Sequence, residues 1–140
     1  MRSAAAVAHQ EIALSSAEVL QLFPGLTMRQ LQWWDEHSIA PCVHEGHKRL
    51  YDAQQCEMVG IVYELRKANI SQERLRRVLH AMKRHKSSAP WLVVFQSGAV
   101  QPAMHTYEAV QKLVKTEEFG LIIDVDEIRR TVRRACQWKM

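Results

Sequence analysis

Two short helices are predicted near the start of the chain, because apolar positions at helical spacing follow two pairs of capping residues. Ser15 is followed by Glu18 three residues later, and Thr27 is followed by Gln30 at the same spacing. A serine or threonine with Glu or Gln three residues on is typical of a reciprocal N-cap, in which side chains satisfy free backbone amides. A short, glycine-containing turn around residues 23–25 connects the two patterns. This sequence predicts a helix-turn-helix, whose second helix can lie in the major groove of DNA.

A basic hairpin and two longer helices are predicted next. Residues 41–51 place Gly46 between apolar positions and end in a basic run, as a basic wing would. Asp52 is expected to cap a helix that runs to about residue 68, with apolar side chains at helical spacing. A further helix is expected from Ser71, with one apolar face and basic residues elsewhere around it. These basic residues fit either a solvated face or contact with DNA phosphates.

The pattern changes its period in the last third of the chain. Residues 83–90 combine a basic run, two serines and a proline, which indicates a linker or boundary. The continuous apolar run Trp91–Phe95 is typical of a strand, and a turn leads from it to a second predicted strand at Val100. A helix that Thr106 can cap, a strand at residues 121–123 and a last helix complete the order strand, strand, helix, strand, helix.

These patterns predict an α+β chain with two structured parts. We expect a disordered arm at residues 1–12 and a winged helix-turn-helix domain, with four helices and a small hairpin, at residues 13–85. A linker is expected at residues 86–90 and a small α/β module at residues 91–140. The module is too small for a roomy ligand cavity, so we expect it to dimerise or to dock a partner. Its aromatic residues either offer apolar surface to a second copy or fill the core of the module itself; they are Trp91, Phe95 and Trp138.

Composition and charge agree with a DNA-binding interpretation but are less specific. The chain of 140 residues has a formal net charge of +4 and a pI near 9.2, which permits a polyanionic partner without requiring one. The first 88 residues carry +3 of this charge, where a DNA-binding domain needs it. No apolar stretch reaches the roughly 18 residues of a membrane span. The three cysteines have no paired spacing, which favours a reducing compartment over a disulfide scaffold. From these two observations we expect a soluble, cytoplasmic protein without a membrane partner.

The order of elements and several residues together resemble a known family. Residues 27–36 (TMRQLQWWDE), residues 46–51 (GHKRLY) and Asp52 at the start of a long helix resemble the DNA-binding domain of the MerR family of bacterial transcription regulators. The similarity spans roughly residues 14–82. It implies that the second helix enters the major groove, that the hairpin wing contacts the flanking backbone, and that a homodimer distorts promoter DNA used by RNA polymerase.

The second helix carries the residues with the clearest expected roles. Arg29, on the exposed side of the first turn, can present a bidentate fork to guanine or phosphate. Leu31 and Trp34 share the core-facing stripe, which leaves Trp33 as the more exposed ring, able to donate its indole N–H to a phosphate. Gln32 stands where the family commonly has a phosphate-binding arginine.

The closing turn and the wing complete the expected site. Ser38 stands where a glycine often closes the second helix, so a left-handed turn there is expected to be costly. Lys48 and Arg49 match the basic positions of the wing and are expected to contact the DNA backbone or the minor groove. The residues expected to contact double-stranded DNA are Ser15, Thr27, Arg29, Gln30, Gln32, Trp33, His47, Lys48, Arg49 and Tyr51.

The sequence also offers residues for two other kinds of site, a metal site and a catalytic site. One segment clusters possible metal ligands of types that suit zinc or copper: Cys42, His44, Glu45 and His47. Their spacing is not that of a structural zinc site and the segment coincides with the wing, so we expect no metal and no cofactor. A catalytic Cys42 or Cys56 is disfavoured because the sequence indicates no orienting third group, and we expect no enzyme.

The favoured function is that of a sequence-specific transcription regulator, acting as a homodimer on a pseudo-palindromic site. An excisionase-like architectural factor, or a protein-interaction factor for which DNA contact is secondary, is the alternative. Binding that tolerates any sequence and weakens steeply with salt would favour the architectural alternative.

Overall fold

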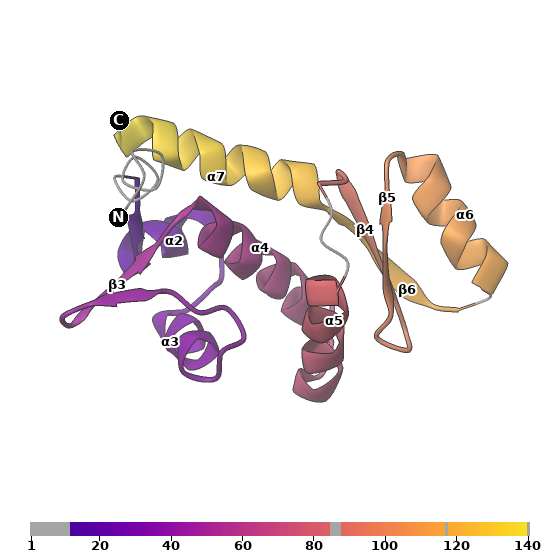
Figure 1. Ribbon diagram of the computed structural model, residues 1–140, viewed down its shortest axis with the longest axis horizontal. Coiled ribbons are helices and arrows are strands. Elements are labelled where there is room, and N and C mark those ends of the chain that lie inside the picture. Colours follow the sequence, from indigo (N-terminus) through magenta and orange to yellow (C-terminus); the bar gives the residue numbers. More distant parts are fainter. Residues whose placement is uncertain (1–11, 85–87, 117, 140) are drawn as a thin grey trace. The chain divides into compact units, whose positions relative to one another are not determined.

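The computed structural model describes residues 12–84, 88–116 and 118–139. The described residues form six helices and two small antiparallel sheets, so the predicted α+β class is confirmed (Figure 1). They divide into two compact units. One unit takes in the described residues up to Tyr63 together with those from Arg129 onward, and the other runs from Glu64 to Ile128. The expected arm and part of the expected linker lie outside the described residues, and the domain boundaries expected from the sequence stay a prediction.

The first unit contains the two capped helices that the sequence predicts. Its elements in chain order are β1 (Leu14–Ser15), α2 (Ser16–Leu22), α3 (Met28–Glu36), β2 (Val43–Glu45), β3 (Lys48–Tyr51) and the larger part of α4 (Ala53–Lys67). The Ser15 hydroxyl accepts a hydrogen bond from the Glu18 amide at 3.2 Å, and the Glu18 carboxylate accepts one from the Ser15 amide at 2.9 Å. Thr27 and Gln30 form the same reciprocal pair, with both bonds at 3.1 Å. Both predicted N-caps are therefore confirmed.

A tight turn shapes the hairpin that follows α3. Glu45 pairs with Lys48, so only two residues connect β2 to β3. Gly46, the first of these two residues, has a φ of +63°. A positive φ at the first position alone is the requirement of a type II′ turn, which matches the twist of a hairpin and favours glycine there. The short strand β1 adds to β3 on the other side, giving the sheet order β1-β3-β2.

The last helix returns to the first unit at its C-terminal end. Helix α7 spans Val125–Lys139 and begins after Asp124, whose carboxylate accepts a hydrogen bond from the Glu127 amide at 3.0 Å. At the other end, the Lys139 ammonium donates to the Glu18 carboxylate at 2.9 Å, which joins residues 121 positions apart in the chain. The first unit thus contains residues from both the early and the late part of the sequence.

The second unit is built on a three-stranded sheet. Its remaining elements are α5 (Gln72–Arg84), β4 (Trp91–Phe95), β5 (Val100–Ala103), α6 (Thr106–Thr116) and β6 (Gly120–Asp124). Strand β4 lies in the middle, in the order β5-β4-β6, and α6 contacts all three strands (Figure 1). The helix covers a core that consists of Val93, Phe95, Ala103 and Ala109, with Trp91, Leu113 and Ile122 packed against it. Trp91 and Phe95 therefore serve this core, whereas the side chain of Trp138 is exposed.

Among the residues that the structure describes, none of the helices is both long enough and apolar enough for a membrane span.

Candidate nucleic-acid interface

Helix α3 presents one buried face and one exposed face. Leu31 and Trp34 are buried, as their three-residue spacing predicts. Arg29 is exposed in the first turn of the helix, and no ion pair or hydrogen bond joins its guanidinium to another described residue. Gln32 and Trp33 are half-buried at the edge of the exposed face. An arginine on the first turn of a solvent-facing helix is suited to reach a groove of DNA.

The exposed edge of α3 ends in a stacked aromatic pair. The rings of Trp33 and His37 lie 3.8 Å apart between centroids, with an angle of 17° between their planes. The Nδ1 atom of His37 also lies 2.9 Å from the Trp33 carbonyl oxygen. The stack restricts the Trp33 ring, and its predicted contact with phosphate stays a prediction. The spacing of four residues between the two rings was the available signal for this pair.

A serine closes α3 in the left-handed conformation. Ser38 has a φ of +55°, and the Ile39 amide donates to the Trp34 carbonyl at 2.8 Å. The Ser38 amide donates to the Asp35 carbonyl at 3.1 Å, which completes the hydrogen-bond pattern of a Schellman motif. The expected turn is therefore formed without a glycine. It brings Ile39 into the core.

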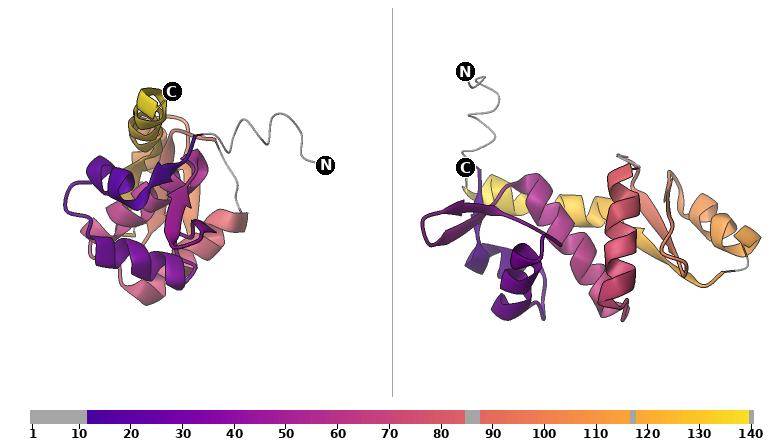
Figure 2. Two further views of the ribbon diagram at one scale, coloured as in Figure 1. Left: turned by 90° about the vertical axis from the view of Figure 1, so that its left-hand side faces the viewer. Right: turned by 60° about the horizontal axis from the view of Figure 1, so that its bottom comes forward.

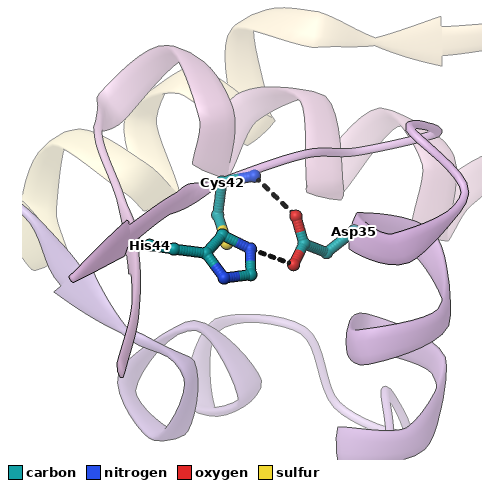
Figure 3. A group of neighbouring side chains, drawn as sticks. All are labelled: Asp35, Cys42 and His44. Carbon is teal, nitrogen blue, oxygen red and sulfur yellow. Dashed lines mark hydrogen bonds and ion pairs between the residues drawn. The ribbon is translucent and has the colours of Figure 1, made fainter. Parts of the chain in front are cut away.

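A buried carboxylate ties α3 to the hairpin. The side chain of Asp35 is only 5 % exposed, and its oxygens accept hydrogen bonds from the Cys42 amide at 3.1 Å and from the Arg49 Nε at 2.8 Å. The His44 Nε2 lies 2.7 Å from the same carboxylate (Figure 3). Burial raises the pKa of Asp35, but the hydrogen bonds from Arg49, Cys42 and His44 outweigh it, so the pKa lies below its ordinary value. The network therefore holds a charged carboxylate between the helix and the hairpin.

Two further polar groups lie beside this carboxylate. Burial raises the pKa of the Cys42 thiol to about 11, so the sulfur is protonated near neutral pH. Tyr51 is fully buried, and burial together with the neighbouring Cys42 raises the pKa of its hydroxyl. This hydroxyl has no hydrogen-bond partner of normal geometry among the described residues. Because its ring does not reach the surface, we do not propose direct DNA contact for Tyr51.

Comparison with known proteins identifies this part of the chain. Residues 18–82 match the model of a family described as MerR HTH family regulatory protein. These residues are a MerR-family helix-turn-helix domain. The resemblance noted in the sequence is thereby confirmed, and a domain of this family indicates a DNA-binding transcription regulator. The comparison with curated proteins finds no match.

Within the MerR-family domain, the hairpin projects away from the helices of its unit (Figures 1 and 2). His47 and Lys48 are exposed at its tip. Arg49 is held differently, because its Nε donates to Asp35 and another of its nitrogens lies 3.6 Å from a carboxylate oxygen of Glu36. Of the wing residues His47, Lys48 and Arg49, the first two are thus available to a partner without breaking an internal ion pair, and Arg49 is not.

The ten predicted DNA-contacting residues fall into three groups in the MerR-family domain. The surface of α3 and the hairpin tip hold Arg29, Gln32, Trp33, His47 and Lys48. Three others form N-caps: Ser15, Thr27 and Gln30. Arg49 belongs to the hydrogen-bond network around Asp35, and Tyr51 is buried.

Asp35 was missed in the sequence, although a signal for it was present. It follows Leu31 by four residues and Trp34 by one, so it continues the buried stripe of α3. A buried acidic residue needs a basic or hydrogen-bonding partner, and the basic run of the hairpin supplies one.

Proposed function

We propose that this chain is a sequence-specific transcription regulator, which binds a pseudo-palindromic promoter site as a homodimer and distorts the DNA there. The observation that carries the proposal is the MerR-family domain at residues 18–82, with an exposed Arg29 in the first turn of its second helix. RNA polymerase is a second proposed partner, because it uses the promoter DNA to which this chain would bind. No enzymatic activity and no cofactor are part of it.

Helix α3 is the proposed reader of bases. Its N-terminal turn carries Arg29, which can form a bidentate contact with the O6 and N7 atoms of a guanine. The capped N-terminus at Thr27 presents the positive end of the helix dipole, which favours a phosphate nearby. Gln32, as a neutral side chain, would add a hydrogen bond without adding to the salt dependence of binding.

The hairpin is the proposed contact to the backbone beside the bases. His47 and Lys48 at its tip are exposed. The hydrogen bonds of Asp35 to Cys42 and Arg49 support a fixed orientation of the hairpin relative to α3. A surface that is ordered before binding loses less conformational entropy when the complex forms.

We propose that the second copy in the homodimer binds at α6. Three exposed apolar residues, Tyr107, Val110 and Val114, follow one another at helical spacing, beside the stripe of Ala109 and Leu113 that packs on the sheet. Side chains 74 %, 45 % and 70 % exposed along one stripe would be covered by the same stripe of a second chain. Two-fold operators are bound by two copies of one helix-turn-helix, so a regulator of this kind needs a surface that a second copy can cover.

Selection of bound sequences from a random duplex pool tests the proposal. The wild type is expected to enrich a two-fold motif with half-sites about one helical turn apart. In Arg29→Ala, enrichment at one position of each half-site should disappear or relax, because one base contact is lost. Arg133→Ala, which removes an exposed arginine of α7, is the control and should enrich the wild-type motif.

The opposite results have a clear meaning. Failure of the wild type to enrich any motif, with an affinity that collapses as salt rises, would contradict a sequence-specific regulator and favour an architectural factor. A motif without two-fold symmetry would contradict the homodimer.

A further inference from the structure

The junction of α3 and β2 brings three metal-ligating side chains together. One ligand atom each from Asp35, Cys42 and His44 lies within 4.8 Å of the others. Asp35 comes from the last turn of α3, Cys42 precedes β2, and His44 lies within β2, so two separate elements converge here (Figure 3). The DNA-binding proposal uses this junction as a support, and it does not use the sulfur or the imidazole as ligands.

The combination of a thiol, an imidazole and a carboxylate suits zinc. Zinc binds sulfur at about 2.3 Å, and imidazole nitrogen or carboxylate oxygen at about 2.0–2.2 Å, mostly in tetrahedral sites. These lengths separate the ligand atoms by roughly 3.3–3.8 Å in a tetrahedron. The 2.7 Å contact between His44 and Asp35 would have to widen by roughly 0.6 Å to reach this range. The Cys42 sulfur lies within 4.8 Å of the other two ligand atoms, so it would have to approach them by about 1 Å at most. The side chain of His44 is 55 % exposed, so it can turn to make that change.

A buried hydroxyl that lies near the Cys42 thiol without a hydrogen bond of normal geometry is a second sign of a ligand at this junction. Tyr51 has no exposed surface, and its hydroxyl makes no normal hydrogen bond among the described residues. It neighbours Cys42. Buried polar groups without a partner are rare and often mark a missing water or ion. A water molecule in the fourth position of a metal at Cys42 would give the Tyr51 hydroxyl its missing partner.

We propose that Asp35, Cys42 and His44 bind one divalent cation of the zinc class, with water as the fourth ligand. Cys42 binds as the thiolate and releases its proton to solvent. The cation replaces the direct contact between His44 and Asp35.

The cation also competes with Arg49 for the Asp35 carboxylate. Glu36, whose carboxylate already lies 3.6 Å from an Arg49 nitrogen, is the alternative partner for the guanidinium. A bound ion thus joins α3 to the hairpin through coordination bonds in place of the present ion pair.

Titration of the metal-free full-length protein with Co²⁺, followed by absorption spectroscopy, tests the site. Co²⁺ is expected to give the visible bands of a four-coordinate ion and a near-ultraviolet band from a bound thiolate, and an equivalent of Zn²⁺ should abolish both. Cys42→Ser should lose the thiolate band, and His44→Gln should lose the four-coordinate bands. The controls Cys136→Ser and His47→Gln change the same residue types outside the cluster and should keep the wild-type spectrum.

Several results would overturn the site. The site is contradicted if the folded wild type shows neither the visible bands nor the thiolate band. It is also contradicted if the visible bands persist in His44→Gln, or if either kind of band is lost in one of the two controls. Far-ultraviolet circular dichroism reports whether each variant is folded. If Cys42→Ser does not fold, His44→Gln decides, because its exposed imidazole contributes little to the core.

Discussion

Different forces hold together two regions of the molecule. One region is the junction between α3 and the hairpin, and the other is the sheet of the second unit. At the junction, a carboxylate that is 5 % exposed accepts hydrogen bonds from Arg49 and from the Cys42 amide. In the sheet, Val93 and Phe95 from the central strand pack with Ala109 of α6, and none of the described residues that form this core is charged.

The contrast indicates where specific function resides. An apolar core is satisfied by any well-packed set of side chains, whereas a buried charge is tolerated only where its partners are correctly placed. The polar junction ties the last turn of α3, the helix that carries Arg29, to the hairpin. We therefore infer that the junction orients the proposed DNA-binding surface and that the sheet mainly supplies stability and the surface of α6.

Removal of the junction carboxylate should have the largest effect. Asp35→Ala leaves Arg49 and the Cys42 amide without their acceptor, and breaking a largely buried pair in this way costs about 3 kcal/mol. Urea unfolding followed by circular dichroism measures the loss. Glu36→Ala is the matched control, because Glu36 approaches the same arginine but is 60 % exposed. Its cost should stay under about 1 kcal/mol, and equal losses in both variants would contradict the proposed importance of burial.

Removal of side-chain volume should lower stability more in the buried core of the sheet than on the exposed face of α6. Val93→Ala deletes two methyl groups from a fully buried position and should lower the free energy of unfolding by about 2 kcal/mol. The same urea experiment applies, and the control is Val114→Ala, because Val114 is 70 % exposed on α6. A change within about 0.5 kcal/mol is expected there. A Val93→Ala loss that small would show that this core is loosely packed.

Acid should weaken the junction before it weakens the sheet. The folded pKa of Asp35 lies below its ordinary value near 3.8, so its contribution is complete above that pH and is lost as the pH falls through the folded pKa. The stability difference between wild type and Asp35→Asn should therefore shrink below about pH 4. For the wild type and Val93→Ala, the difference should stay constant over the same range. A gap for Asp35→Asn that does not depend on pH would contradict a charged carboxylate in the folded state.

The smallest effect is expected at the turn that closes α3. Ser38→Gly should raise stability by about 0.5 kcal/mol, because glycine avoids the left-handed penalty but gains freedom in the unfolded chain. Asn69 adopts a similar φ of +62° in the second unit, and asparagine tolerates this region. Asn69→Gly should therefore change stability less than Ser38→Gly in urea unfolding. A destabilised Ser38→Gly would mean that the serine side chain itself contributes to the turn.

Local features of the chain were predictable because their causes lie within a few residues. The N-caps at Ser15 and Thr27 depend on a partner three residues away, and the hairpin depends on a two-residue turn with Gly46. The burial of Trp34 and the greater exposure of Trp33 follow from helical spacing. These predictions are confirmed by the structure.

Features that depend on distant residues were not predictable in the same way. The pairing of β1 with β3 and the contact of Lys139 with Glu18 join segments far apart in the chain. Arg49 was expected to contact DNA because it lies in a basic run. That run does not reveal its hydrogen bond to Asp35, 14 residues earlier. Tyr51 was also expected to contact DNA, and nothing in the neighbouring sequence reveals that its side chain is buried. Only the folded structure shows which side of the hairpin each of these residues takes.

Methylation interference on the selected DNA site tests most directly whether α3 reads bases in the major groove. Methylation of guanine N7 places a methyl group on an atom that is accessible only from that groove. We predict that methylation of one guanine in each half-site weakens binding of the wild type by about tenfold or more, which corresponds to the worth of a bidentate contact. Binding of Arg29→Ala should be insensitive to methylation of that guanine. Equal interference in both proteins, or none in the wild type, would contradict base reading by Arg29.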